Sequence, residues 1–86
     1  MLAQRAAQIK RSLADRLREL RREKKWSQEK LAEQAEMHRT YLAGIERALR
    51  NPSLENLVKL ANALDITVAE LFSTTPHGEA QQRRDP

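Results

Sequence analysis

Cysteine is absent from the 86 residues of this chain, which contain only two histidines, three prolines and two glycines. Without cysteine the chain forms no disulfide and offers no thiolate ligand, and His38 and His77 alone do not make a zinc site. No apolar run is long enough to span a bilayer, and the first twelve residues lack the continuous apolar segment of a secretion signal. We therefore expect a cytoplasmic protein that holds no metal and no cofactor.

A recognisable catalytic set is also missing from the sequence. There is no glycine-rich phosphate loop, and Ser27, His38 and Glu46 each have a structural interpretation at a helix cap, a helix start or a core pair. A chain of 86 residues fits one small domain, and short helices leave little room for a cleft. We therefore predict that the protein is not an enzyme. A domain of this size is only marginally stable alone, so a partner subunit would stabilise it.

Positive charge is what the chain has in excess. Its net charge of +4 suits a polyanionic partner, but it is also compatible with an ordinary soluble domain. Between residues 10 and 25 eight basic residues stand against three acidic ones, and a solvated helix face is the alternative interpretation of this run. The basic residues are Lys10, Arg11, Arg16, Arg18, Arg21, Arg22, Lys24 and Lys25.

Apolar residues first recur at intervals of three and four, which predicts a helix from about Ala3 to Lys24. We expect Leu13, Leu17 and Leu20 to be buried in the domain. Residues 1–12 extend beyond what a minimal domain requires, so we interpret them as a helical extension that either frays or covers a neighbouring subunit. The domain itself is predicted to occupy residues 13–72.

The stretch from Ser27 to Asn51 restarts its apolar phase near Glu36, which predicts two short helices that meet at a steep angle, as in a helix-turn-helix. Ser27 is placed to cap the first of them, although Lys30 stands where a capping box would have Glu. Gly44, inside the second helix, costs roughly 1 kcal/mol of helix propensity relative to Ala. It indicates either a close approach by another surface or simple tolerance.

Two further helices follow a loop that contains a proline. The first is expected from about Ser53 to Leu64, and the second is a short helix capped by Thr67. Residues 73–86 lack apolar periodicity, which is typical of a disordered tail. The whole chain is therefore predicted to be all-α.

The strings SQEKLA, HRTYLAGIERALRN and SLENLVKLANALDITVAELF resemble helix-turn-helix regulators of the Cro and phage-repressor (XRE) type over Leu13 to Phe72. Within that family the RTYLAGIER and RN strings look most like the small controller proteins of restriction-modification systems. The resemblance implies a five-helix, lambda-repressor-like DNA-binding domain. It also implies a homodimer that binds a palindromic operator through the major groove, often in its own promoter, to regulate transcription.

The resemblance assigns roles to individual residues. Arg39 and Thr40 match positions that meet bases and nearby backbone, and a guanidinium at position 39 can fork onto guanine. Gln28, at the first turn of its helix, matches the position that clamps a phosphate, for which the helix N-terminus is also suited. The expected DNA-binding residues are Gln28, His38, Arg39, Thr40, Tyr41, Arg47, Arg50, Asn51 and Asn56.

The resemblance also predicts contacts within and between subunits. Arg21 and Glu46 are expected to form a largely buried ion pair. The short last helix carries Val68, Leu71 and Phe72, which either close the core or meet another chain, and we expect them to build a dimer interface. The family's usual glycines are replaced by Glu36 and Ala48, so a turn that needs positive φ would be strained there.

A protein-binding module on the same fold, such as an antitoxin or an adaptor, is the alternative function. Such a module would favour exposed aromatic and aliphatic side chains on the Arg39 helix. Basic and polar residues predominate there instead, which favours DNA. A small antitoxin can bind both DNA and a partner protein, so the alternative stays open.

Overall fold

The computed structural model describes residues 2–73, and the predicted tail lies outside the described residues from position 74 onward. Five helices and no strand make up this part of the chain, as the all-α prediction requires. They are α1 (Leu2–Glu23), α2 (Gln28–Gln34), α3 (Arg39–Glu46), α4 (Leu54–Leu64) and α5 (Val68–Leu71).

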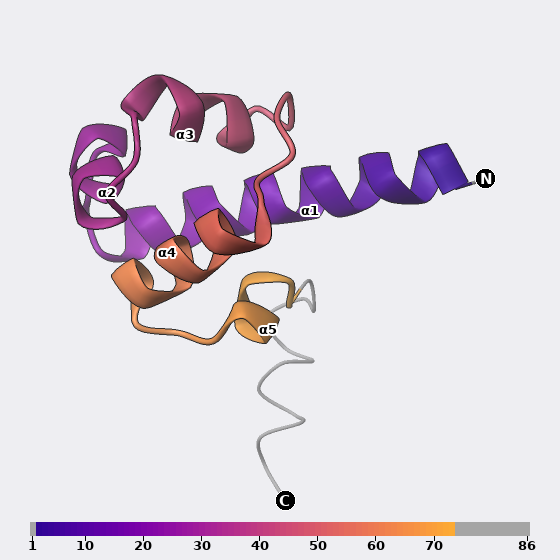
Figure 1. Cartoon of the computed structure of the whole chain (residues 1–86). Helices are drawn as coiled ribbons and strands as arrows, with labels where there is room; N and C mark the ends of the chain where they lie inside the picture. Colours follow the sequence, from indigo (N-terminus) through magenta and orange to yellow (C-terminus); the bar gives the residue numbers. More distant parts are fainter. Residues whose placement is uncertain (1, 74–86) are drawn as a thin grey trace, which may run out of the picture.

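The long first helix carries the rest of the molecule on its C-terminal half. α1 contacts α3 and α5, α2 contacts α3 and α4, and α4 contacts α5. Figure 1 shows α2 and α3 on one side of α1 and α5 on the other, with the N-terminal turns of α1 projecting beyond the body. Leu2 and Ile9 in those turns are 81% and 55% exposed, whereas burial begins at Leu13. α1 itself runs unbroken through the expected boundary at residue 12.

Leucine dominates the core. The largest fully buried apolar side chains come from all five helices, and they are Leu17, Leu31, Leu42, Ile45, Leu60 and Leu71. Leu71 was expected at a dimer interface, and that prediction is wrong because its side chain is 0% exposed in the single chain. It closes the core on the short α5, while Val68 and Phe72 stay partly exposed.

Three hydroxyl side chains cap helix N-termini as the sequence indicates. Ser27 Oγ accepts a hydrogen bond from the Lys30 amide at 3.0 Å, and Ser53 Oγ accepts one from the Asn56 amide at 3.1 Å. Thr67 and Glu70 form a reciprocal capping box at the start of α5. These caps satisfy amides that the helices themselves leave unpaired.

The first four helices all end in the same way. A left-handed residue follows each helix, and its φ is 60° at Lys25, 56° at Glu36, 61° at Ala48 and 61° at Asp65. The amide of the next residue then donates to a carbonyl five positions back, as Met37 does to Ala32 at 2.9 Å and Leu49 to Gly44 at 2.8 Å. This is the hydrogen bond of a Schellman motif. None of the four positions is glycine, so each stores roughly 1 kcal/mol of backbone strain.

Candidate nucleic-acid interface

A buried carboxylate fixes the orientation of α3. Glu46 is 1% exposed and accepts two hydrogen bonds from Arg21 of α1, from Nε at 2.8 Å and from Nη2 at 3.0 Å. The ion pair that the resemblance implies is therefore present. Gln28 of α2 adds a third bond from Nε2 to Glu46 Oε1 at 3.0 Å. Because Glu46 joins three helices, it sets which side of α3 faces the core.

Other arginines of α1 bind backbone carbonyls at the C-terminal ends of short helices. Arg18 donates to the Glu46 carbonyl of α3 and to the Asp15 carboxylate, and Arg16 Nε donates to the Glu70 carbonyl of α5 at 3.1 Å. Guanidinium groups complement the partial negative charge of helix C-termini. Part of the basic run is thus neither a solvated face nor a surface for a polyanion, and sequence reasoning missed this role.

The opposite side of α3 carries polar and basic groups. Leu42, Ile45 and Glu46 are buried, while Arg39 and Thr40 are exposed in the first turn. Arg47, Arg50 and Asn51, in the segment after α3, are exposed as well. His38 is the exposed N-cap residue of α3 and makes no side-chain capping bond. Most of the predicted DNA-binding residues are therefore brought to one end of the molecule by a single helix and its flanks.

Gln28, Tyr41 and Asn56 are partly buried members of the predicted set. Gln28 Nε2 uses one of its two hydrogens on Glu46, so the other stays available for an outside acceptor. Only the backbone N–H of Asn56 is used by the cap of α4, where it donates to Ser53 Oγ. Tyr41 lies under Arg50, whose guanidinium carbon is 5.8 Å from the ring centroid, and its hydroxyl donates to the Asn51 carbonyl at 3.4 Å.

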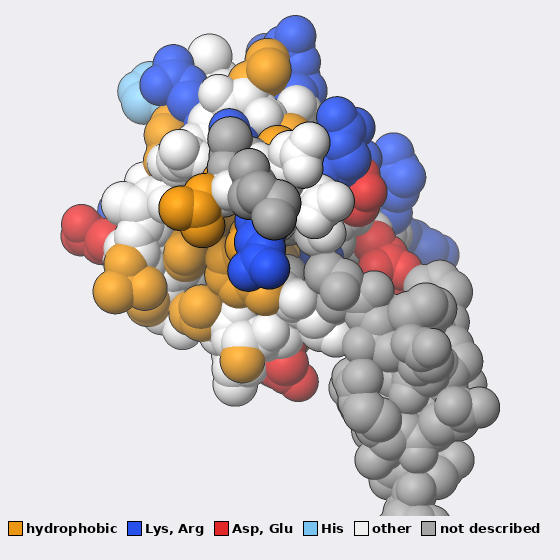
Figure 2. Space-filling model, turned by 90° about the vertical axis from the view of Figure 1, so that its right-hand side faces the viewer, with side chains coloured by type: hydrophobic (Ala, Val, Ile, Leu, Met, Phe, Trp, Pro, Cys, Tyr) orange, Lys and Arg blue, Asp and Glu red, His pale blue; other side chains and the backbone are white. Residues whose placement is uncertain are grey.

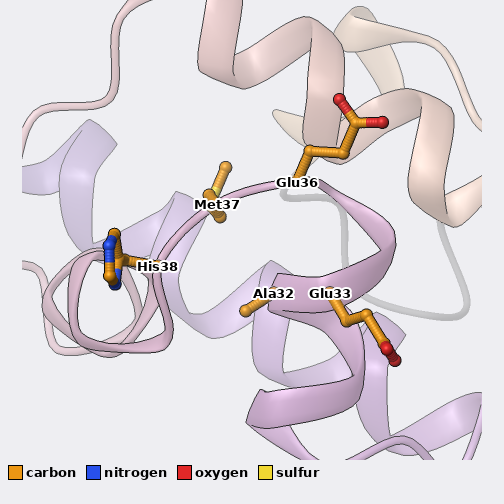
Figure 3. A pocket seen from close by; sticks show the side chains of 5 residues that line it. All are labelled: Ala32, Glu33, Glu36, Met37 and His38. Atoms are coloured by element: carbon orange, nitrogen blue, oxygen red, sulfur yellow. The ribbon is translucent and has the colours of Figure 1, made fainter.

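A shallow depression lies beside the turn between α2 and α3. It is lined by Ala32, Glu33, Glu36, Met37 and His38. Figure 3 shows that Glu33, Glu36 and His38 point in different directions rather than toward one centre. Within residues 2–73 there is no group of three His, Cys, Asp or Glu side chains that would hold a metal ion.

Charged and apolar side chains are unevenly distributed over the face of the molecule shown in Figure 2. Figure 2 shows Lys and Arg side chains along the upper and right-hand edges of one face, and apolar side chains gathered in its lower left part. The exposed large apolar residues are Leu2, Ile9, Leu49, Leu54 and Val58. None of the described helices combines the length and apolar character that crossing a membrane requires.

The helix-turn-helix family model matches residues 17–71, which is more than half of the chain and includes the last four helices. The chain belongs to this helix-turn-helix family. It is 43% identical over 58 residues to the control protein C.BamHI of Bacillus amyloliquefaciens, covering 67% of this chain and 72% of the relative. It is 47% identical over 66 residues to the control protein C.MunI of a Mycoplasma species, covering 76% and 89%.

Among solved structures, the restriction-modification controller protein C.AhdI from Aeromonas hydrophila superposes with a TM-score of 0.71 and 51% identity. The superposition covers 73% of this chain and 96% of C.AhdI. These matches confirm the predicted XRE-type family and the likeness to controller proteins. They also identify the function class of this helix-turn-helix protein, which is a DNA-binding transcription regulator.

Proposed function

We propose that this helix-turn-helix protein binds a palindromic operator as a homodimer and regulates transcription, including that of its own gene. α3 would lie in the major groove of each half-site. The observation that carries the proposal is the buried Glu46, because it turns the apolar side of α3 inward and leaves Arg39 and Thr40 outward. The protein would act in the cytoplasm, where bacterial DNA is reached, and without catalysis.

Different residues would recognise bases and contact phosphates. Arg39, in the exposed first turn of α3, is long enough and forked to donate to guanine O6 and N7. Thr40, His38 and Tyr41 flank it and would meet bases or nearby backbone. The proposed phosphate contacts come from the start of α2, from the segment after α3 and from α4, and they are Gln28, Arg47, Arg50, Asn51 and Asn56.

The dimer would bury apolar surface at the end of the molecule formed by α4 and α5. Val68 and Phe72 are partly exposed on α5, and Leu54 and Val58 are 72% and 42% exposed one turn apart on α4. Exposed apolar groups at this density on a small domain favour a partner of the same kind. Two α3 helices would then reach half-sites about one DNA turn, roughly 34 Å, apart.

The regulatory system is proposed from the relatives. The control proteins C.BamHI and C.MunI and the controller protein C.AhdI match this chain over most of their own lengths. We infer a controller role over the neighbouring genes, of the restriction-modification type named for C.AhdI. The extension formed by residues 1–12 lies outside the family match, and it would be the alternative dimer interface if α5 is not used.

Electrophoretic mobility of the DNA upstream of the protein's own gene tests the proposal. The full chain should shift this DNA at concentrations that leave a scrambled duplex of equal length free, at matched salt. Equal shifts of both duplexes would contradict sequence-specific binding, and the absence of any shift would favour the protein-binding alternative. Sedimentation of the free chain and of the complex tests the dimer, and monomer alone in both samples at micromolar concentration would remove it.

A further inference from the structure

Gly44 lies in the middle of α3, where glycine is costly. The backbone there does not explain it, because no glycine of the described chain has positive φ. An ordinary helical position would accept alanine and gain helix propensity. A reason for glycine must therefore lie in the space around its Cα.

That space is filled by one side chain. A Cβ built on Gly44 would lie 2.6 Å from Arg50 Cγ and 3.6 Å from both Cβ and Cδ of Arg50, and these are its nearest neighbours. The first distance is far inside van der Waals contact. Because the clash involves Cγ, near the base of the side chain, relieving it requires a different Arg50 rotamer or a shift of the loop. A methyl group at position 44 would thus displace the Arg50 side chain.

Tyr41 of the same helix contacts the Arg50 guanidinium and the neighbouring residue of the loop. The guanidinium lies over the Tyr41 ring, three positions before Gly44 on the helix, with 5.8 Å from its carbon to the centroid. The Tyr41 hydroxyl donates to the carbonyl of Asn51, the next residue in the loop. Arg50 is nevertheless exposed, and no described residue accepts a side-chain hydrogen bond from it. Its donors are thus oriented but take no acceptor among residues 2–73.

We propose that Gly44 is a positioning residue for DNA binding. Because it lacks a Cβ, the aliphatic part of the Arg50 side chain occupies the space beside its Cα, and the guanidinium lies over Tyr41. This inference rests on the proposed function, in which Arg50 contacts DNA. An arginine that is ordered before binding loses less side-chain entropy when it meets a phosphate. The packing of Arg50 against Gly44 therefore increases the affinity for DNA, although Gly44 itself makes no hydrogen bond to the DNA.

A double-mutant cycle of Gly44→Ala and Arg50→Ala tests this role. Gly44→Ala should weaken operator binding by about two- to tenfold, the cost of ordering one long side chain, while displacement of Arg50 offsets the gain in helix propensity and leaves the denaturant midpoint close to that of the parent. In the Arg50→Ala background the same change should raise the midpoint and leave operator affinity unaltered. Loss of affinity that appears only when Arg50 is present is a result that a merely structural glycine would not give.

Three outcomes would overturn the inference, and they separate it from the proposed function. Equal weakening by Gly44→Ala in both backgrounds would mean that the DNA itself approaches position 44. If Gly44→Ala does not weaken binding in the parent background while Arg50→Ala does, Gly44 does not position Arg50, and Arg50 remains a DNA contact. An Arg50→Ala protein with full operator affinity would contradict both the positioning role of Gly44 and the role of Arg50 as a DNA contact.

Discussion

Two sets of arginines in this molecule differ in what they face. Arg16, Arg18 and Arg21 of α1 all donate to acceptors within the protein, chiefly carbonyls at helix ends and the Glu46 carboxylate. Arg39, Arg47 and Arg50 lie on or after α3, are exposed, and donate no side-chain hydrogen bond to any residue between 2 and 73. The first set holds helices together, and the second is available to an outside ligand.

The comparison shows that the density of basic residues does not locate a binding surface. The run from residue 10 to 25 is the most basic stretch of the chain that the structure describes, yet three of its arginines are used for folding. Arg39 on α3, and Arg47 and Arg50 after it, are exposed, so their donors are not taken up by acceptors of the described residues. What an arginine does is decided by the acceptors within its reach.

The largest expected effect comes from breaking the buried pair. Glu46→Ala leaves Arg21 with an unpaired, half-buried charge, and we expect the free energy of unfolding to fall by about 3–5 kcal/mol. Glu33→Ala, on an exposed side of α2, is the matched control and should change it by less than about 0.5 kcal/mol. Urea denaturation measures both. A Glu46→Ala protein with the midpoint of the parent would show that the pair does not hold α3.

The next effect distinguishes the two sets by DNA affinity. Arg39→Ala should weaken binding to the operator by about 1–3 kcal/mol and binding to scrambled DNA much less, because a bidentate guanine contact is lost. Arg16→Ala is the matched control from α1, and it should leave both affinities unchanged under conditions in which the variant is folded. Titration by fluorescence anisotropy at matched salt gives the four values. Equal losses on both DNAs for Arg39→Ala would mean that Arg39 holds a phosphate and that DNA shape or another residue supplies the specificity.

A smaller, opposite effect is expected at Glu36, the acidic residue in the turn before α3. Glu36→Gly should raise the free energy of unfolding by roughly 1 kcal/mol, because glycine relieves the left-handed conformation at φ 56°. Glu36→Gln removes the charge but keeps the strain, so it should leave stability nearly unchanged. Glu33→Gly, inside α2, should instead lower stability by a similar amount. Equal stabilities for Glu36→Gly and the parent would show that this turn is not strained.

The smallest effect lies in the salt dependence of binding. Arg50→Ala should reduce the slope of log K against log salt concentration by about one, since one ion contact is lost. Gln28→Ala should weaken operator and scrambled DNA alike without changing the slope, because an amide releases no counterion. A slope for Arg50→Ala equal to that of the parent would place Arg50 away from the phosphates.

The sequence predicted local structure well because local structure depends on neighbours in the chain. Ser27, Ser53 and Thr67 begin their helices as expected, and Glu36 and Ala48 adopt the left-handed conformation that the family's glycines imply. These features depend on caps and turns of a few residues, which the order of amino acids displays directly.

Contacts between distant segments were harder to predict. Leu71 is buried against the core rather than at a subunit interface, because α5 packs on α1 and α4 and turns this side chain inward, while Val68 and Phe72 stay partly exposed. Arg16 and Arg18 bind helix ends that lie 54 and 28 positions away, so no sequence pattern announces them. The contact of Gly44 with Arg50 joins nearby residues, but the sequence alone left open whether Gly44 indicated a close approach or simple tolerance.

Selection of binding sites from a randomised DNA pool, with the parent and with Arg39→Ala in parallel at matched salt, tests the central claim most directly. The account predicts that the parent recovers a two-fold symmetric site with half-sites about one DNA turn apart and a guanine preference in each half. Arg39→Ala should recover the same site with that one preference lost. Recovery of identical preferences by both proteins would contradict the claim that the outward face of α3 reads the operator through Arg39.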